Sequence, residues 1–237
     1  MASLPWKALL ELCRVSNLPT VWTNVLAAAV LATGRFPLAG YLLAALSLSL
    51  FYCAGMVLND IYDAEVDRQA RSTRPIPSGR VLLPPAQALV RLLFAAAFGS
   101  LLFLPYRRSA LAALLLTVAI IAYDRWHKGH PASVLLMALC RFLVFMVTAL
   151  ALSGRVAPAV VAAGLAQFLY VIILSLVARW ENRRPQRFST PVIPLMIAGI
   201  SLVDGLVLAI VAAPAWLLAG VGGMVATLLG QRLVRGD

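Results

Sequence analysis

The sequence predicts an all-α, polytopic membrane protein, a helix bundle of about eight and at most nine transmembrane helices. Of its 237 residues, 62% are hydrophobic and only 12% are charged, whereas a soluble domain carries about 25% charged residues. Apolar runs separated by short charged clusters fill nearly the whole length, so no stretch remains for a second, water-soluble domain. We therefore expect one membrane domain over residues 1–237.

Eight apolar runs are candidates for transmembrane helices. The first, fourth and last are shorter than the roughly 20 residues that a helix needs to cross the hydrocarbon. We expect these three helices to be tilted or to extend into the interface; otherwise the number of transmembrane helices differs from eight by one. The predicted spans are Leu18–Thr33, Leu38–Leu58, Ala86–Leu104, Ser109–Tyr123, Ala132–Leu152, Ala157–Ala178, Pro191–Ala212 and Ala215–Gly230.

The formal net charge of +11 comes from lysines and arginines that flank apolar spans. This pattern is typical of membrane topology and contact with membrane lipids, and it argues against a nucleic-acid partner. With a cytoplasmic N-terminus, fourteen basic residues fall in inner segments, and the four in outer segments are Arg35, Arg107, Arg108 and Arg155. The bias favours an even number of crossings with both termini inside. We expect a multi-pass protein of a bacterial-type inner membrane.

An acidic stretch, NDIYDAEVD at residues 59–67, continues the second span and holds four of the nine acidic residues. On a helix, Asp60, Asp63 and Asp67 lie on one face, and Asn59 stacks with Asp63. Carboxylates so placed repel unless a cation neutralises them, and Mg²⁺ prefers oxygen ligands and bridges carboxylates to substrate phosphates. The alternative is a solvated, charged helix end. The arginines that follow favour the Mg²⁺ site, because they are phosphate-binding groups.

Residues 74–80, RPIPSGR, contain two prolines and a glycine, which predict a fixed loop over the acidic face. The run NDIYDAEVDRQARSTRPIPSG resembles the first aspartate-rich motif of the UbiA superfamily of intramembrane prenyltransferases. Arg14, with Pro19 and Asn24 beyond it, is similar to the start of the first helix in that family. The resemblance implies a bundle of about nine helices around a lipid-accessible central cavity, and the acidic motif at the cytoplasmic end of its second helix.

The resemblance also implies an Mg²⁺-dependent transfer of a prenyl group from a prenyl diphosphate to an aromatic or other lipophilic acceptor. Electrostatic stabilisation of the departing diphosphate would be the enzyme's contribution, with Asp63 and Asp67 as the catalytic residues. The expected metal ligands are Asn59, Asp60, Asp63 and Asp67, and the expected substrate-binding residues are Arg14, Asn24, Arg68, Arg74, Tyr123, Lys128 and Glu181.

Two regions depart from the family pattern. Where the family has a second acidic motif, residues 175–183 contain only Glu181, and Tyr123 is followed by His127 and Lys128 instead of a lysine four residues on. These departures resemble the divergent branch called UbiA-like EboC proteins. They leave open a non-catalytic protein that binds or transports a polyprenyl or other lipid phosphate. A CDP-alcohol phosphotransferase is disfavoured, because the acidic stretch lacks its Asp-Gly and later Ala-Arg elements.

Two further features lie inside predicted spans. Asp204 is near the middle of the seventh span, where an ionisable side chain is costly. We expect either a structural pair with Arg141 of the fifth span or a role in the cavity, such as orienting an acceptor. Several glycines near the end of the chain are expected to allow close helix contact; these are Gly220, Gly222, Gly223 and Gly230.

Overall fold

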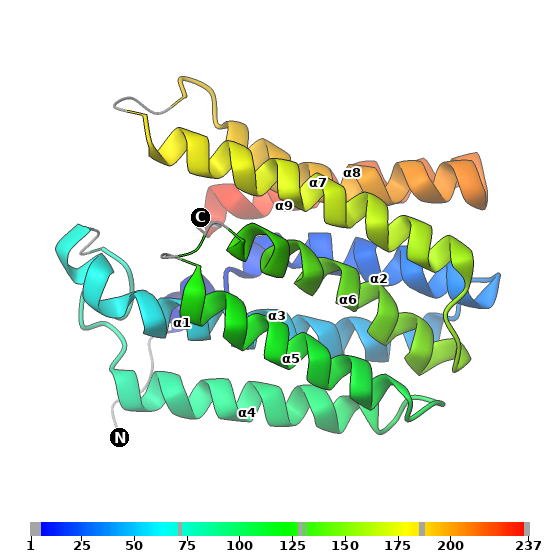
Figure 1. The fold of residues 1–237 in the computed structure, drawn as a ribbon, viewed down its shortest axis with the longest axis horizontal. Helices are drawn as coiled ribbons and strands as arrows, with labels where there is room; N and C mark the ends of the chain where they lie inside the picture. Colours follow the sequence, from blue (N-terminus) through cyan, green and yellow to red (C-terminus); the bar gives the residue numbers. More distant parts are fainter. Residues whose placement is uncertain (1–5, 71–72, 128–129, 131, 185–187, 235–237) are drawn as a thin grey trace.

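The protein is a bundle of long helices, seen in a computed structural model that describes residues 6–70, 73–127, 130, 132–184 and 188–234 (Figure 1). Across these residues there is no β-strand, and eight helices are long and apolar enough to cross a membrane. The predicted all-α membrane fold is confirmed. The α-helices are α1 (Trp6–Leu12), α2 (Leu18–Thr33), α3 (Leu38–Ala70), α4 (Leu83–Leu101), α5 (Ser109–Trp126), α6 (Ser133–Ser153), α7 (Pro158–Asn182), α8 (Val192–Val211) and α9 (Leu217–Leu233), with short 3-10 turns at Val15–Asn17 and Pro214–Trp216.

Helix α3 is much longer than its predicted span, because it runs from Leu38 to Ala70 through the whole acidic stretch. Hydropathy locates the point where apolar residues stop, at Leu58, whereas a helix ends only where its backbone is interrupted. No proline or glycine occurs between Gly55 and Pro75, so the helix carries the acidic residues out of the apolar part of the bundle.

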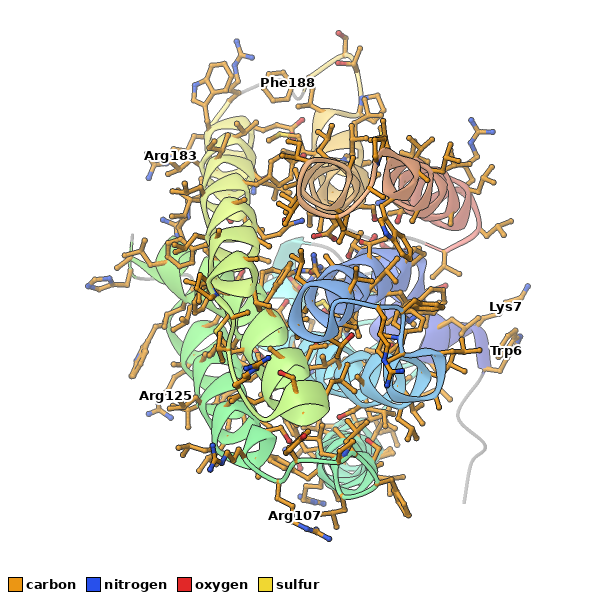
Figure 2. All side chains as sticks on the ribbon, turned by 90° about the vertical axis from the view of Figure 1, so that its right-hand side faces the viewer. Trp6, Lys7, Arg107, Arg125, Arg183 and Phe188 are labelled. Carbon is orange, nitrogen blue, oxygen red and sulfur yellow. The ribbon has the colours of Figure 1, made fainter. Side chains whose placement is uncertain are left out.

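One end of the bundle gathers the acidic stretch and the segments next to it. In Figure 1 the end of α3, the start of α4, α1 and the C-terminal end of α9 all lie at the left-hand end. Seen from the opposite end, the labelled side chains Lys7, Arg125 and Arg183 point outwards from the bundle rather than into its interior (Figure 2).

Helix α2 is the central element of the bundle and packs against α3, α6, α7, α8 and α9. Its middle presents Ala27, Ala28 and Ala29, which are fully buried. Small side chains let neighbouring helix backbones approach closely, which is the usual means of packing helices in a membrane. The sequence of α2 therefore suits a helix surrounded by other helices rather than by lipid.

Helices α8 and α9 approach so closely at Gly205 and Gly220 that no side chain fits between them there. A Cβ added to Gly220 would lie 2.6 Å from the Cα of Gly205 and 2.7 Å from the carbonyl oxygen of Ser201. Gly223 and Gly230 are also packed tightly, so the predicted close contact is confirmed for these glycines. It is wrong for Gly222, where an added Cβ would meet nothing within 4 Å.

Candidate functional site

The predicted acidic face is formed by the last turns of α3. Asn59, Asp60, Asp63 and Asp67 expose between 4% and 8% of their surface, so these polar groups are buried. Arg74 contacts three of them: its Nη1 lies 3.5 Å from Asp60 Oδ1 and 3.9 Å from Asp63 Oδ2, and it forms a hydrogen-bonded ion pair with Asp67. One guanidinium therefore serves as the shared counterion of three buried carboxylates.

Arg74 is held there by the fixed loop that the sequence predicted. Ile76 and Val81 are buried against α1 and α4 and anchor the loop at both ends. The backbone N–H of Val81 donates to the carbonyl of Pro75 at 3.0 Å, and Gly79 takes the left-handed conformation with φ of 74°. A left-handed backbone suits glycine because it has no Cβ. The prolines and the glycine thus fold the chain back over the acidic face.

Two more cationic groups reach the acidic face from other parts of the chain. Arg14, which precedes α2, donates from Nη2 to Asp60 Oδ1 at 3.3 Å and to Asn59 Oδ1 at 3.5 Å. His127, just after α5, places Nε2 3.2 Å from Asp63 Oδ1. This hydrogen bond to the Asp63 carboxylate raises the pKa of His127 above its ordinary value, because it favours the protonated ring.

Asn59 connects the acidic face to a cavity inside the bundle. Its Nδ2 donates to Asp124 Oδ1 at 3.2 Å, and Asp124 lies in the cavity wall. The cavity has a volume of about 170 Å³ and is walled mainly by apolar side chains from α2, α3, α5, α6, α7 and α8. Its charged and hydroxyl-bearing wall residues are Arg14, Tyr52, Tyr123, Asp124 and Arg141.

The chain that forms this buried acidic face and apolar cavity also matches a known protein family. The family model described as the UbiA prenyltransferase family matches residues 19–234. The chain belongs to the UbiA prenyltransferase family. The match covers nearly the whole chain, so the resemblance seen in the acidic motif extends through the transmembrane bundle.

Individual relatives agree with this UbiA assignment. The chain is 38% identical over 89 residues to the digeranylgeranylglyceryl phosphate synthase of Sulfolobus acidocaldarius, which is 38% of this chain and 32% of that protein. The matched part thus spans about a third of that curated relative. A solved structure from work on digeranylgeranylglyceryl phosphate synthase in membranes has a TM-score of 0.66 at 19% identity, over 96% of this chain and 86% of that one.

A second solved structure, of a UbiA homologue from Archaeoglobus fulgidus bound to DMAPP and Mg²⁺, has a TM-score of 0.62 at 19% identity. It covers 97% of this chain and 88% of that one. At these identities the structural matches establish the fold, a UbiA bundle. The finer resemblance to the EboC branch stays a prediction.

The acidic face offers carboxylate and amide oxygens, which are the kind of ligand that Mg²⁺ prefers. An amide and three carboxylates lie on one buried helical face, and Mg²⁺ is usually held by one or two carboxylates together with waters and substrate phosphates. Within the described residues, no three His, Cys, Asp or Glu side chains are grouped closely enough to enclose a metal by themselves. The arrangement therefore fits an open site that a diphosphate completes, with Arg74 close to the same oxygens.

Several residues predicted to bind substrate lie elsewhere. Arg68 points away from the acidic face and pairs with Glu65 at 3.0 Å, with side-chain exposures of 56% and 75%. Glu181 accepts a hydrogen bond from the backbone N–H of Phe188 at 3.1 Å. Lys128 is outside the residues that the structure describes. In this structure, then, neither Arg68 nor Glu181 contributes to the acidic face.

Asp124 and His127 also contribute to the site, although neither is among the site residues predicted from the sequence. Both follow Tyr123 within one helical turn, so a spacing signal was present in the sequence. Tyr123 and His127 stack at 5.3 Å between ring centroids. This turn reaches the acidic face only because α5 packs beside α3, and the local sequence pattern does not predict that packing.

Proposed function

We propose that this UbiA family member transfers a prenyl group from an Mg²⁺-bound prenyl diphosphate to a lipophilic acceptor inside the membrane. The observation that carries this proposal is the position of the acidic face. Four buried oxygen-bearing side chains adjoin an apolar cavity through the Asn59–Asp124 hydrogen bond. A charged diphosphate suits the first environment and a prenyl chain suits the second.

Asn59, Asp63 and Asp67 are the residues that would hold Mg²⁺, with Asp60 beside them. The ion, when bound, neutralises the charge that develops on the departing diphosphate. Arg14 and Arg74 are the cations already placed at the same face, and both can donate to phosphate oxygens once a ligand competes for them. Arg68 and Arg74 were both predicted to bind substrate, and Arg74 is therefore the better candidate for contact with the diphosphate.

The cavity wall next to the acidic face suits the prenyl end of the substrate. Tyr52 and Tyr123 line the cavity, and the face of an aromatic ring attracts a cation. An allylic cation formed when the diphosphate departs would meet these rings before it meets the acceptor. With the acidic face at the cytoplasmic side, as the positive-inside bias favours, the diphosphate would enter from the cytoplasm.

A specific observation keeps the alternative function open. Glu181, the one carboxylate of the region matching the second acidic motif, caps the backbone of Phe188 instead of approaching the acidic face. A protein with one acidic face suits binding or transport of a polyprenyl or other lipid phosphate without cleavage. The two functions differ in whether bound diphosphate is released.

Measuring diphosphate release distinguishes prenyl transfer from binding or transport without cleavage. Purified protein is given a series of allylic diphosphates of increasing chain length, with and without Mg²⁺ and with a lipophilic acceptor mixture. Asp63→Asn and Asp67→Asn are compared with Glu65→Gln, a control on the same helix whose side chain is 75% exposed. Release that needs Mg²⁺, survives in Glu65→Gln and is lost in both aspartate variants supports transfer. Mg²⁺-dependent binding without release at any chain length refutes it and favours transport.

A further inference from the structure

The side-chain amide of Asn59 lies between two groups that accept only one of its two orientations. Its Nδ2 donates to Asp124 Oδ1 at 3.2 Å, and its Oδ1 accepts from Arg14 Nη2 at 3.5 Å. An ionised carboxylate only accepts hydrogen bonds and a guanidinium only donates them, so exchanging the amide oxygen and nitrogen would break both contacts. The same Nη2 lies 3.3 Å from Asp60 Oδ1. The amide oxygen is therefore turned to the acidic face and the NH₂ group to α5.

Asp124 makes this contact from a position where a carboxylate is costly. It lies near the end of α5 in the wall of the apolar cavity and exposes only 3% of its surface. Its Oδ2 accepts no hydrogen bond from the residues that the structure describes, and a buried polar atom without a partner is destabilising. A neutral acceptor would satisfy the N–H at a lower cost. The property that a carboxylate adds is that it cannot donate, which excludes the other orientation of the amide.

The end of α5 is fixed against α3 on both sides of Asp124. One turn earlier, a Cβ added to Gly55 would lie 3.2 Å from Ile120 Cγ2, so the two helices are closely packed there. Three residues later, His127 Nε2 lies 3.2 Å from Asp63 Oδ1, and its Nδ1 lies 3.0 Å from the carbonyl oxygen of Asp124. The position of the Asp124 carboxylate relative to α3 is therefore set by packing and by other hydrogen bonds as well as by its own contact with the amide.

The orientation of this amide decides what the acidic face offers to a cation. Mg²⁺ takes oxygen ligands, whereas an amide NH₂ group carries donors only. The carboxylates of the acidic face are acceptors and would attract the NH₂ group if α5 did not hold it. Arg14 opposes that turn only through its 3.5 Å contact with the amide oxygen, and a phosphate that competes for Arg14 would remove this contact. Asp124 is then the group that keeps the oxygen at the face.

We propose that Asp124 is a positioning residue of the metal site, because its carboxylate holds the amide of Asn59 with the oxygen toward the acidic face. The inference rests on the proposed function, since it takes Asn59 as a ligand of Mg²⁺. In this role Asp124 acts through Asn59 and does not itself touch the ion. Groups that hold metal ligands in this way matter for affinity, and their loss typically weakens metal binding roughly 10- to 100-fold.

Binding of Mn²⁺ to the full chain in neutral detergent tests this without prenyl diphosphate. Mn²⁺ prefers the same oxygen ligands as Mg²⁺, and electron paramagnetic resonance measures the concentration of the free ion. Asp124→Leu removes the acceptor and places a side chain of similar size in an apolar wall. A double-mutant cycle with Asn59→Ala then shows whether Asp124 acts through the amide or through its charge.

Asp204→Asn is the matched control. Asp204 on α8 is also a buried carboxylate that accepts a hydrogen bond from an asparagine amide, that of Asn24 on α2 at 2.7 Å. Arg141 donates to the oxygen of the same amide at 2.9 Å. The predicted pair of Arg141 and Asp204 is thus indirect, and the three side chains form a network through Asn24. The control removes a buried carboxylate from this network and leaves the contact between Asn59 and Asp124 intact.

We expect Asp124→Leu to bind Mn²⁺ about tenfold more weakly than wild type, while Asp204→Asn stays within about twofold. The melting temperature of Asp124→Leu in a chelator should not fall, because leucine suits the apolar wall. In Asn59→Ala the three aspartates still bind the ion, and adding Asp124→Leu should change that affinity by about twofold or less. A direct attraction between the Asp124 charge and the ion would persist in that background. A merely structural role would lower the melting temperature and leave Mn²⁺ binding unchanged.

Three results would overturn the inference: no Mn²⁺ binding by wild type, wild-type affinity in Asp124→Leu, or an equal loss in the Asn59→Ala background. If Asp124→Leu does not fold, or if Asn59→Ala binds no Mn²⁺, the combination of Asn59→Asp with Asp124→Asn decides. This exchange keeps the hydrogen bond with donor and acceptor swapped and returns an oxygen to the face. It should bind Mn²⁺ at least as tightly as wild type, and weaker binding refutes the proposal. Failure of the transfer function is distinguishable, since it appears as absent diphosphate release while Mn²⁺ binding still depends on Asp124.

Discussion

Replacing Arg74 with glutamine is the sharpest test of how the acidic face is neutralised. Removing one partner of a buried ion pair costs about 3–5 kcal/mol, because the remaining charge stays buried without compensation. Asp60 and Asp63 keep Arg14 and His127 as partners, whereas Asp67 loses the one ion pair that it forms with the described residues. Arg74→Gln should therefore lower the free energy of unfolding by about 3 kcal/mol, the lower end of this range.

Thermal unfolding in detergent, followed with increasing Mg²⁺, measures this loss and its reversal. In a chelator, Arg74→Gln should lower the melting temperature by about 6–12 °C, at about 2–4 °C per kcal/mol for a protein of this size. Added Mg²⁺ should restore much of it, since a ligand at a hundred times its dissociation constant contributes about 2.7 kcal/mol. The same addition should stabilise wild type less, because there Arg74 competes for the same oxygens.

Arg68→Gln is the matched control, because Arg68 is an arginine on the helix that carries the acidic face but pairs with Glu65 in an exposed position. Its effect should stay within about 0.5 kcal/mol. Equal losses in the two variants would refute the claim that Arg74 is the shared counterion. A loss in Arg74→Gln that Mg²⁺ does not reverse would show that the metal and the guanidinium do not use the same carboxylates.

Two further predictions concern helix packing and pH. Gly220→Ala should destabilise the protein by about 1–3 kcal/mol, because the added Cβ would lie 2.6 Å from backbone atoms. Gly222→Ala should change the free energy of unfolding by less than about 0.5 kcal/mol. Equal shifts of the melting temperature in the two variants would contradict this account of the packing. The raised pKa of His127 makes its pair with Asp63 fully effective below about pH 6.5 and lost as pH rises through the raised value. The melting-temperature difference between wild type and His127→Gln, measured in a chelator, should shrink as pH rises, and a constant difference would count against this account.

Much of the fold was predictable because membrane spans are recorded in local hydropathy. All eight predicted spans overlap helices of the structure, and α2 and α6 start and end within about three residues of the prediction. The apolar runs stop at Leu58 and Ala178, whereas α3 and α7 continue with charged residues to Ala70 and Asn182. The helical continuation through the acidic stretch was predicted, and the continuation of α7 was not. Hydropathy indicates which residues contact lipid, whereas a helix ends where a residue such as proline or glycine interrupts its backbone.

The acidic face was predictable for the same local reason, since residues three and four apart share one side of a helix. The same geometry explains why Arg68, which was predicted to contact phosphate, does not lie on the acidic face. It follows Asp67 directly, and successive residues of a helix point about 100° apart, which turns Arg68 to the outside with Glu65. Arg14 and His127 reach the face only through tertiary packing, which no local spacing encodes.

The two cations near the cavity differ in how they are held, and this difference bears on what each is for. Arg74 is on a loop and binds carboxylates that a metal and a phosphate can compete for. Arg141 is on a transmembrane helix and is bound by uncharged groups, Thr20 and Asn24, whose own positions are fixed by burial. Asn24 was predicted to bind substrate, and that stays a prediction, but its amide oxygen and nitrogen are already used inside the network. A ligand of the acidic face would therefore compete with Arg74 for its carboxylates, whereas the hydrogen bonds of Arg141 to Thr20 and Asn24 do not involve those carboxylates.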